Sequence, residues 1–244
     1  MSTFARIITV CLFVSSVAFS QESKSKAEPK SIAEFTQNMQ KFDGYFPFYW
    51  NEKDGKIWLE IDKWQTEFLY VNSLPAGVGS NDIGLDRGQL GTTRIVAFQR
   101  VGPKVLLIQP NYDYRAITDN AAERKAVEDA FAKSVIWGFE VSAHTGSSVL
   151  VDATAFFLRD AHDVIGDLQS ANQGNYRLDA SRSVFSLPRT KNFPQNTEIE
   201  AMLTFTGDPK GWWIRSVTPS AEAVTERPHH SLVALPDAGH TPTA

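Results

Sequence analysis

The chain has 244 residues, a formal net charge of −4, and 21% charged residues of both signs. It carries no basic stripe, which argues against nucleic acid as a partner. The only cysteine, Cys11, lies within the first twenty residues. Without that segment the chain has no disulfide, thiolate metal site or cysteine nucleophile.

The first twenty residues have the pattern of a secretory signal peptide. Arg6 precedes an apolar run over residues 7–19, and Ala18-Phe19-Ser20 provides a small-x-small cleavage site. The run is shorter than the roughly 20 apolar residues of a transmembrane helix. We therefore expect residues 1–20 to be removed and the protein to be exported, periplasmic or secreted, with no membrane span after signal removal. A retained membrane anchor is the alternative.

Residues 21–42 predict a polar linker followed by a short helix. The stretch QESKSKAEPK (21–30) is polar and charged, as mobile linkers are. Ser31 followed three residues later by Glu34 is a capping-box signature. Ile32, Phe35 and Met39 share one face of the predicted helix.

Residues 43–235 predict one β-rich domain. The aromatic stretch YFPFYW (45–50) and the alternating stretch IWLEID (57–62) flank a turn at Asp54-Gly55, which indicates a β-hairpin. A strand over residues 66–74 comes next. A second hairpin over residues 92–114 turns at VGPK (101–104).

Residues 121–135 form the clearest predicted helix. Asn120 is a suitable N-cap, and Glu123 follows three residues later. Alanines, Val127 and Phe131 make an apolar stripe at helical spacing. We expect this amphipathic helix to pack on a sheet.

The remaining sequence predicts six more strands and a short helix. Two strands flank the His144-Thr145-Gly146 turn, and a helix follows near residues 162–169. Further strands are expected over residues 177–186, 197–207 and 211–220. A final strand, Arg227–Leu235, is expected to pair at a sheet edge, with residues 236–244 as a mobile tail.

These elements indicate a mostly β (α+β) fold. We expect an antiparallel sheet or sandwich of roughly nine or ten short strands, with two or three inserted helices. Strands and helices do not alternate regularly, which argues against a parallel sheet. The six tryptophans are expected to pack in the core; carbohydrate binding by exposed aromatic rings is the alternative.

The glycine-rich loop GSNDIGLDRG (79–88) contains Asp82 and Asp86. Carboxylates in such a loop can bind calcium, but the EF-hand spacing is absent. We therefore expect Asp82, Asp86 and Arg87 to structure the loop, with Asp86 paired to Arg87.

No complete catalytic motif is present. A zinc protease needs HExxH, which places two imidazoles and a catalytic carboxylate at one metal; the chain lacks it. His229 and His230 are adjacent, so on a strand they point to opposite faces. The serine elbow G-x-S-x-G is also absent. We assign no catalytic or metal-binding residue and expect no cofactor in this chain.

Several stretches together resemble a known family. They are FDGYFPFYW with GKIWLEI after it, residues 68–111, DASRSVF (179–185), FPQNTEIEAMLTF (193–205) and RPHHSLVALPDAGHTP (227–242). They are similar to the N-terminal, non-catalytic region of large exported bacterial zinc-dependent metalloproteases. In that family, segments of unknown function precede a metzincin-like catalytic domain, whose HExxH lies downstream of the matching region.

The resemblance implies a non-catalytic protein that packs beside, or orients, a catalytic domain. Zinc is expected only in that downstream domain, and the expected partner is the catalytic domain or another protein surface. Arg182, His229 and His230 lie in matching stretches and are candidates for interdomain contact. The chain is expected to be a fragment, a truncated product or a stand-alone relative. A self-contained β-rich module that binds glycan or protein is the alternative hypothesis.

Overall fold

The computed structural model describes residues 31–237 and 239–240. The expected signal peptide, residues 21–30 of the expected linker, and residues 238 and 241–244 of the expected tail lie outside the described residues. No helix in the described part is long and apolar enough to cross a membrane.

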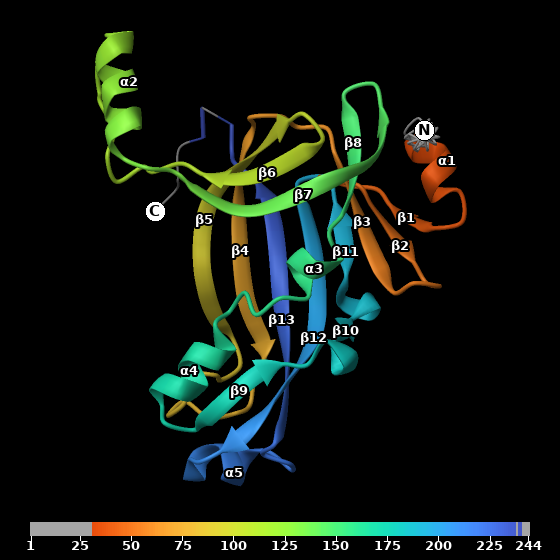
Figure 1. The fold of residues 1–244 in the computed structure, drawn as a ribbon, viewed down its shortest axis with the longest axis vertical. Helices are drawn as coiled ribbons and strands as arrows, with labels where there is room; N and C mark the ends of the chain where they lie inside the picture. The colour runs from red at the N-terminus through yellow and green to blue at the C-terminus, as the bar shows by residue number, and fades with distance from the viewer. Residues whose placement is uncertain (1–30, 238, 241–244) are drawn as a thin grey trace, which may run out of the picture.

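The described chain forms one sheet of thirteen strands that curls into a nearly closed barrel (Figure 1). All pairs of named strands are antiparallel, so the expected mostly β, antiparallel fold is confirmed. The order along the sheet is β1 (Gln40–Phe42), β2 (Phe48–Asn51), β3 (Lys56–Ile61), β8 (Ser148–Asp152), β7 (Ser134–Thr145), β6 (Lys104–Gln109), β5 (Gln89–Val101), β4 (Glu67–Ala76), β13 (Ala223–Ala234), β12 (Asn196–Pro209) and β10 (Val184–Phe185).

Two further strands pair with β12 and are β9 (Gly174–Leu178) and β11 (Lys191–Phe193). The helical elements of the described residues are α1 (Ile32–Thr36), α2 (Ala121–Ala130), α3 (Thr154–Phe157), α4 (Val164–Ser170), α5 (Trp212–Val217) and the short 3-10 turns η1 (Ala180–Arg182) and η2 (Leu187–Arg189). The sequence distinguishes fewer strands because β1, β10 and β11 have only two or three residues each.

Alternation of apolar and polar residues explains how the barrel is filled. Buried and partly exposed residues alternate along β3 and β4, as expected where one sheet face covers a core. Strands far apart in the sheet order share one core cluster because the sheet curls; its fully buried members include Phe48, Leu59, Phe68, Val96, Leu107, Val149 and Ile199.

The two ends of the sheet meet near Phe46. Its ring packs against Phe68 (5.0 Å between centroids) and Phe98 (5.3 Å). Its backbone N–H donates to Thr197 Oγ1 (3.0 Å) on β12, and the N–H of Tyr45 donates to the Phe193 carbonyl oxygen (2.7 Å). These long-range bonds bring the region before β2 against β11 and β12.

The expected capping box of α1 is confirmed. Ser31 Oγ accepts from Glu34 N (3.2 Å), and Glu34 accepts from Ser31 N (2.9 Å). Ile32 and Phe35 pack over β2, β3 and β8, in a small core cluster that includes Leu150. The predicted face of this helix is therefore the one that it buries.

Two strand predictions are wrong. The sequence around Trp212 and Trp213 reads as a strand, but it forms α5, whose Ile214 is fully buried. The last strand, expected at a sheet edge, is β13, which begins at Ala223 and pairs with β4 on one side and β12 on the other. Alternation marks a strand but does not show whether both of its edges are paired.

Buried apolar residues, rather than ion pairs, organise the glycine-rich loop. Ile83 and Leu85 are buried against the cluster that contains Leu74 and Leu168. The expected Asp86–Arg87 pair does not form among the described residues, because Asp86 instead accepts a hydrogen bond from Gln89. Asp82 and Arg87 are exposed. The loop also bonds to itself through Val78 N and the Leu85 carbonyl oxygen (2.9 Å).

Leu85→Ala is therefore expected to lower the free energy of unfolding by about 3 kcal/mol, as a cavity-forming core substitution does. Arg87→Ala is expected to change it by less than about 0.5 kcal/mol, since the side chain is exposed. Urea unfolding of both variants at neutral pH measures the two effects. A larger loss in Arg87→Ala than in Leu85→Ala would restore the ion-pair explanation.

Candidate functional site

A long arm leaves the barrel between β6 and β7. It comprises residues 110–133 and carries α2 at its far end (Figure 1). Asn120 caps α2 by accepting a hydrogen bond from Ala122 N (3.0 Å), as the sequence predicts. Asn111 Nδ2 donates to the Ala132 carbonyl oxygen (3.2 Å) and ties together the two sides of the arm.

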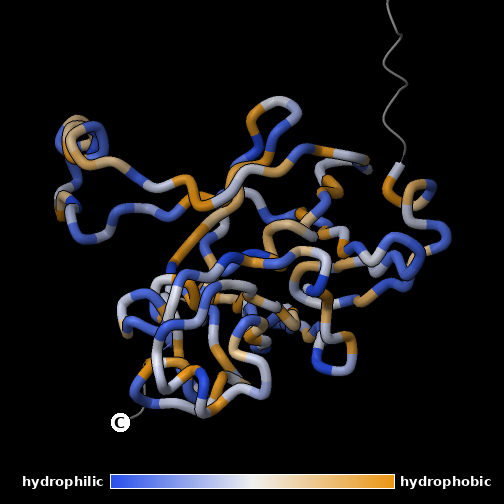
Figure 2. Tube along the Cα trace, turned by 60° about the horizontal axis from the view of Figure 1, so that its bottom comes forward, coloured by the Kyte–Doolittle hydropathy of each residue, from blue (hydrophilic) through white to orange (hydrophobic). Residues whose placement is uncertain are grey.

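The prediction that this helix packs on a sheet is wrong. No residue of α2 is buried, and Figure 2 shows the arm standing clear of the rest of the trace with hydrophobic and hydrophilic residues side by side. The amphipathic pattern is present, but its apolar face has no covering layer among the described residues.

Large apolar side chains lie exposed along the arm and at its base. Ile117 is 93% exposed and Tyr114 is 54% exposed. The Tyr114 ring stacks on Phe131 at 3.9 Å between centroids, with an angle of 1° between the ring planes. Tyr112 and Val135 are exposed nearby in the chain. Large exposed apolar patches are uncommon on monomeric proteins and usually mark an interaction surface.

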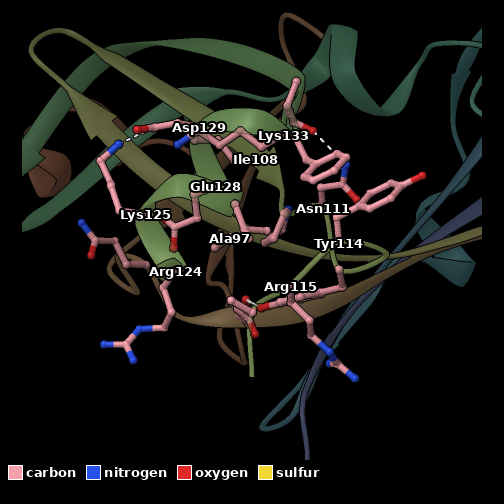
Figure 3. Close-up of a pocket in the computed structure, with 18 of the residues that line it drawn as sticks. Ala97, Ile108, Asn111, Tyr114, Arg115, Arg124, Lys125, Glu128, Asp129 and Lys133 are labelled. Atoms are coloured by element: carbon pink, nitrogen blue, oxygen red, sulfur yellow. Dashed lines mark hydrogen bonds and ion pairs between the residues drawn. The ribbon is translucent and has the colours of Figure 1, made fainter. Parts of the chain in front are cut away.

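The arm and the barrel enclose an open cavity of about 770 Å³, called here the arm cavity (Figure 3). Barrel residues such as Ala97 and Ile108 line one side. Tyr114, Arg115 and α2 line the other. The cavity is thus a mixed polar and apolar hollow beside an exposed apolar arm.

Several charges around the arm cavity are already engaged. Lys125 pairs with Asp129 along α2, and Arg124 donates to the Thr118 carbonyl oxygen (2.6 Å). Tyr112 donates to Glu67 on β4. Figure 3 shows the side chains of Arg115 and Arg124 extending away from α2 and from each other. The cavity has no concentrated charge of one sign, which does not favour a strongly charged small ligand.

The end of β13 lies at the same end of the sheet as the arm. Ala234 pairs with Phe68 on β4, and the adjacent Glu67 pairs with Ala97 on β5. Ala97 in turn pairs with Ile108 on β6, just before the arm begins. This register places the chain that follows β13 at the sheet end from which the arm projects.

His230, a candidate for interdomain contact, is instead fully buried in the barrel. Its Nε2 lies 3.0 Å from the Phe157 carbonyl oxygen, so Nε2 carries the proton. Its Nδ1 then accepts from Tyr70 Oη (2.9 Å), which itself accepts from Arg159 (3.1 Å). Burial first, and then the nearby charge of Arg159, lower the pKa of His230 to about 3. His230 is a neutral, fully bonded core residue.

His229, the neighbouring candidate, points to the other face of β13 and binds two glutamates. Its Nε2 lies 2.6 Å from Glu198 and its Nδ1 lies 3.5 Å from Glu200, both on β12. Burial tends to raise the pKa of Glu198, but hydrogen bonds from His229, Ser231 and Asn196 outweigh burial and hold the pKa below its usual value. Both nitrogens of His229 are therefore engaged within its own sheet.

Arg182, the third candidate, is half-exposed and pairs with Asp179 through Nε (2.7 Å). Asp179 also accepts from Ser181 N, which caps η1. No hydrogen bond or ion pair joins Arg182 to either histidine in the described chain. The three candidates do not form one site.

One buried carboxyl group in the barrel lacks partners. Glu226 on β13 is 1% exposed, and neither of its oxygens has a hydrogen-bond partner among the described residues. Burial first, and then the neighbouring carboxylates of Asp160 and Asp167, raise the pKa of Glu226 to about 8. Across the residues that the structure covers, no cluster of three or more His, Cys, Asp or Glu could hold a metal ion.

Sequence reasoning missed Tyr112, Tyr114 and Ile117 as surface residues. The available signal was the stretch between the second hairpin and the Asn120 cap, which contains two tyrosines and an isoleucine among polar residues. The predicted hairpin over residues 92–114 included Tyr112 and Tyr114 in its second strand, and so it hid this signal. Only the structure shows that the stretch belongs to the arm.

Comparison with protein families gives two adjacent matches. Residues 29–77 match the domain of unknown function DUF5118, and residues 88–242 match the domain of unknown function DUF5117. No curated protein and no solved structure matches the chain. The two matches share one sheet, since β4 of the first pairs with β5 and β13 of the second. The longer match covers more than half of the sequence, and the chain therefore belongs to the DUF5117 family.

Proposed function

We propose that this protein is an exported, non-catalytic docking module that holds a partner protein domain with its arm. The observation that carries this proposal is the unpartnered apolar surface of the arm, with Tyr114, Ile117 and Phe131 exposed. A surface helix usually buries its apolar face to be stable. In this protein, the partner domain covers the apolar face of the arm.

The proposed occupant is the catalytic domain of a zinc-dependent, metzincin-like metalloprotease. Two considerations support this choice. The sequence resembles the region that precedes such a domain, and β13 delivers the chain to the sheet end that carries the arm. A domain connected at that end meets the arm and the arm cavity first. Zinc then belongs to the partner, and the arm's role is to orient that domain or restrict access to it.

The mode of contact follows from the side chains. Stacked Tyr114 and Phe131 form a rigid aromatic pair, and aromatic residues dominate the binding energy of protein interfaces. Ile117, which is 93% exposed, supplies a further apolar side chain on the same arm. Residues on the cavity wall, such as Arg115 and Glu128, supply a polar rim.

The triple variant Tyr114→Ala/Ile117→Ala/Phe131→Ala is expected to bind the partner at least about tenfold more weakly. The probe is a purified HExxH-bearing catalytic domain from a protein of the resembled family, titrated calorimetrically into the chain from residue 21 onward. That chain retains every described residue. The melting temperature is expected to stay nearly unchanged, because the three side chains are exposed.

Leu90→Ala is the matched control. Leu90 is also a large exposed apolar residue, but it pairs with Ser73 far along β5 from the arm. Its removal is expected to leave the affinity unchanged. Equal affinity of the triple variant and the original chain, or no binding by the original chain, would contradict the proposal.

A further inference from the structure

A second exposed aromatic surface lies at the opposite end of the molecule from the arm. Figure 1 shows α5 at the bottom of the long axis and α2 at the top. Trp212 is 74% exposed and Trp213 is 37% exposed. Val217, on the last turn of α5, is exposed as well. The remaining four tryptophans are partly buried against the protein, so the two rings on α5 are the most exposed ones in the described chain.

Hydrogen bonds and a buried side chain fix the helix that carries the two rings. Gln173 is buried, and its side-chain oxygen accepts from Ile214 N (3.0 Å). Its carbonyl oxygen accepts from Lys210 N (2.8 Å) and Gly211 N (3.1 Å). A Cβ on Gly211 would lie 2.0 Å from the Gln173 side chain, so glycine permits this close approach. Ile214 anchors the helix in the core.

Two basic residues, Lys210 and Arg215, flank the rings, although the whole chain is acidic. Asp208 and Glu222 lie in the same part of the fold, and Arg215 donates to the Pro209 carbonyl oxygen (2.5 Å), so Lys210 is the free basic side chain beside the rings in the described part of the chain. Lys210 and Arg215 are both exposed. The whole chain carries −4. Basic residues beside exposed tryptophans are the combination that favours the headgroup layer of an anionic membrane.

The shape of this surface limits the kind of partner. Neither the arm cavity nor the shallow hollow around Tyr176 and Arg182 includes a residue of α5. Small molecules and glycans are usually held in concave sites. A protruding end that presents indole rings instead suits a broad, flat partner with a polar surface and an apolar interior.

We propose that α5 is a membrane-contact tip, in which Trp212 and Trp213 enter the headgroup layer of an anionic phospholipid bilayer. Lys210 and Arg215 face the lipid phosphates, and the barrel stays outside the bilayer. Binding is peripheral and reversible, because two rings and two charges bury far less than a spanning helix. The proposal is independent of the arm and its partner.

Vesicle sedimentation tests this proposal. The chain from residue 21 onward, which lacks the apolar run at residues 7–19, is mixed with phosphatidylcholine vesicles with or without about a quarter phosphatidylglycerol. We expect binding to the anionic vesicles, weakening with added salt, and a blue shift of tryptophan fluorescence. Trp212→Ala/Trp213→Ala is expected to reduce the bound fraction about tenfold, and Lys210→Glu to reduce it less.

The matched control is Tyr114→Ala/Ile117→Ala, which removes exposed apolar side chains from the arm. It is expected to bind vesicles normally, whereas the tryptophan variant is expected to bind the catalytic-domain probe normally. No binding to anionic vesicles, or equal binding by the tryptophan variant, would overturn the membrane-contact tip. Binding to a glycan array that the same tryptophan variant abolishes would assign the rings to carbohydrate instead.

Discussion

A chain reduced to residues 88–244 is expected not to fold, although it retains the whole DUF5117 match. The missing part contains β4, which lies between β5 and β13. Its removal leaves two unpaired strand edges in the middle of the sheet. It also removes buried core side chains from the first part of the chain, namely Phe46, Phe48, Ile57, Leu59, Ile61, Phe68, Tyr70, Leu74, Ile83 and Leu85.

The free energy lost with these buried side chains decides whether the shortened chain can fold. Each such side chain stabilises the fold by about 1.5–3 kcal/mol when buried. Ten of them exceed the roughly 5–15 kcal/mol that separates a folded domain from its unfolded chain. Circular dichroism and urea titration of the shortened chain are expected to show no cooperative transition.

Adding the missing part as a second polypeptide is the control. The split falls in the glycine-rich loop, so residues 31–87 supplied in trans are expected to restore β-structure by pairing β4 with β5 and β13. A cooperative transition in residues 88–244 alone would show that the two family matches are independent folding units.

Glu226→Gln is expected to stabilise the protein strongly at alkaline pH and little at acidic pH. The folded-state pKa of Glu226 is raised to about 8, above its ordinary value of 4.5. Between these values the folded protein holds a proton that the unfolded chain has lost. The free energy of unfolding therefore falls as pH rises from about 4.5 to about 8. Glutamine resembles the protonated carboxyl group and does not titrate.

The expected gain for Glu226→Gln is about 5 kcal/mol above pH 8 and close to zero near pH 4.5. Urea unfolding of both proteins at pH 5, 7 and 8.5 measures it. His230 has a folded-state pKa of about 3, so its contribution to the free energy of unfolding declines below its ordinary pKa of 6.5. That contribution is present in both proteins and cancels in the difference.

Glu198→Gln is the control of opposite sign. Glu198 is partly buried, whereas Glu226 is fully buried, and the Glu198 carboxylate accepts hydrogen bonds from His229, Ser231 and Asn196. Removing its charge is expected to cost about 1–2 kcal/mol at neutral pH. A pH-independent difference between Glu226→Gln and the original protein would mean that Glu226 is not buried as a neutral acid.

Much of the fold can be predicted from local patterns. The capping box at Ser31, the hairpin turn at Gly55 and the N-cap at Asn120 all depend on neighbouring residues, and all are present. α5 could not be predicted in this way. Its tryptophans, isoleucine and valine favour a strand, but Gln173, distant in sequence, accepts the N–H of Ile214 and caps the helix.

The candidate site could be predicted only in part. The amphipathic pattern of α2 is correct, yet a pattern of apolar residues does not show what covers them. The adjacent histidines were correctly expected to face opposite sides of a strand, as His230 in the core and His229 beside Glu198 show. Their burial and internal hydrogen bonds depend on β4, β12 and α3, which the sequence of β13 does not contain.

Site-specific photocrosslinking from the arm tests the docking proposal most directly. A benzophenone amino acid replaces Ile117 in one version of the protein and Leu90 in another, and both are made in the organism that carries the gene. We expect irradiation to join the Ile117 version, but not the Leu90 version, to a domain that mass spectrometry identifies by an HExxH motif. A crosslink from Ile117 only to proteins without that motif, or no crosslink beyond that of Leu90, would contradict the account.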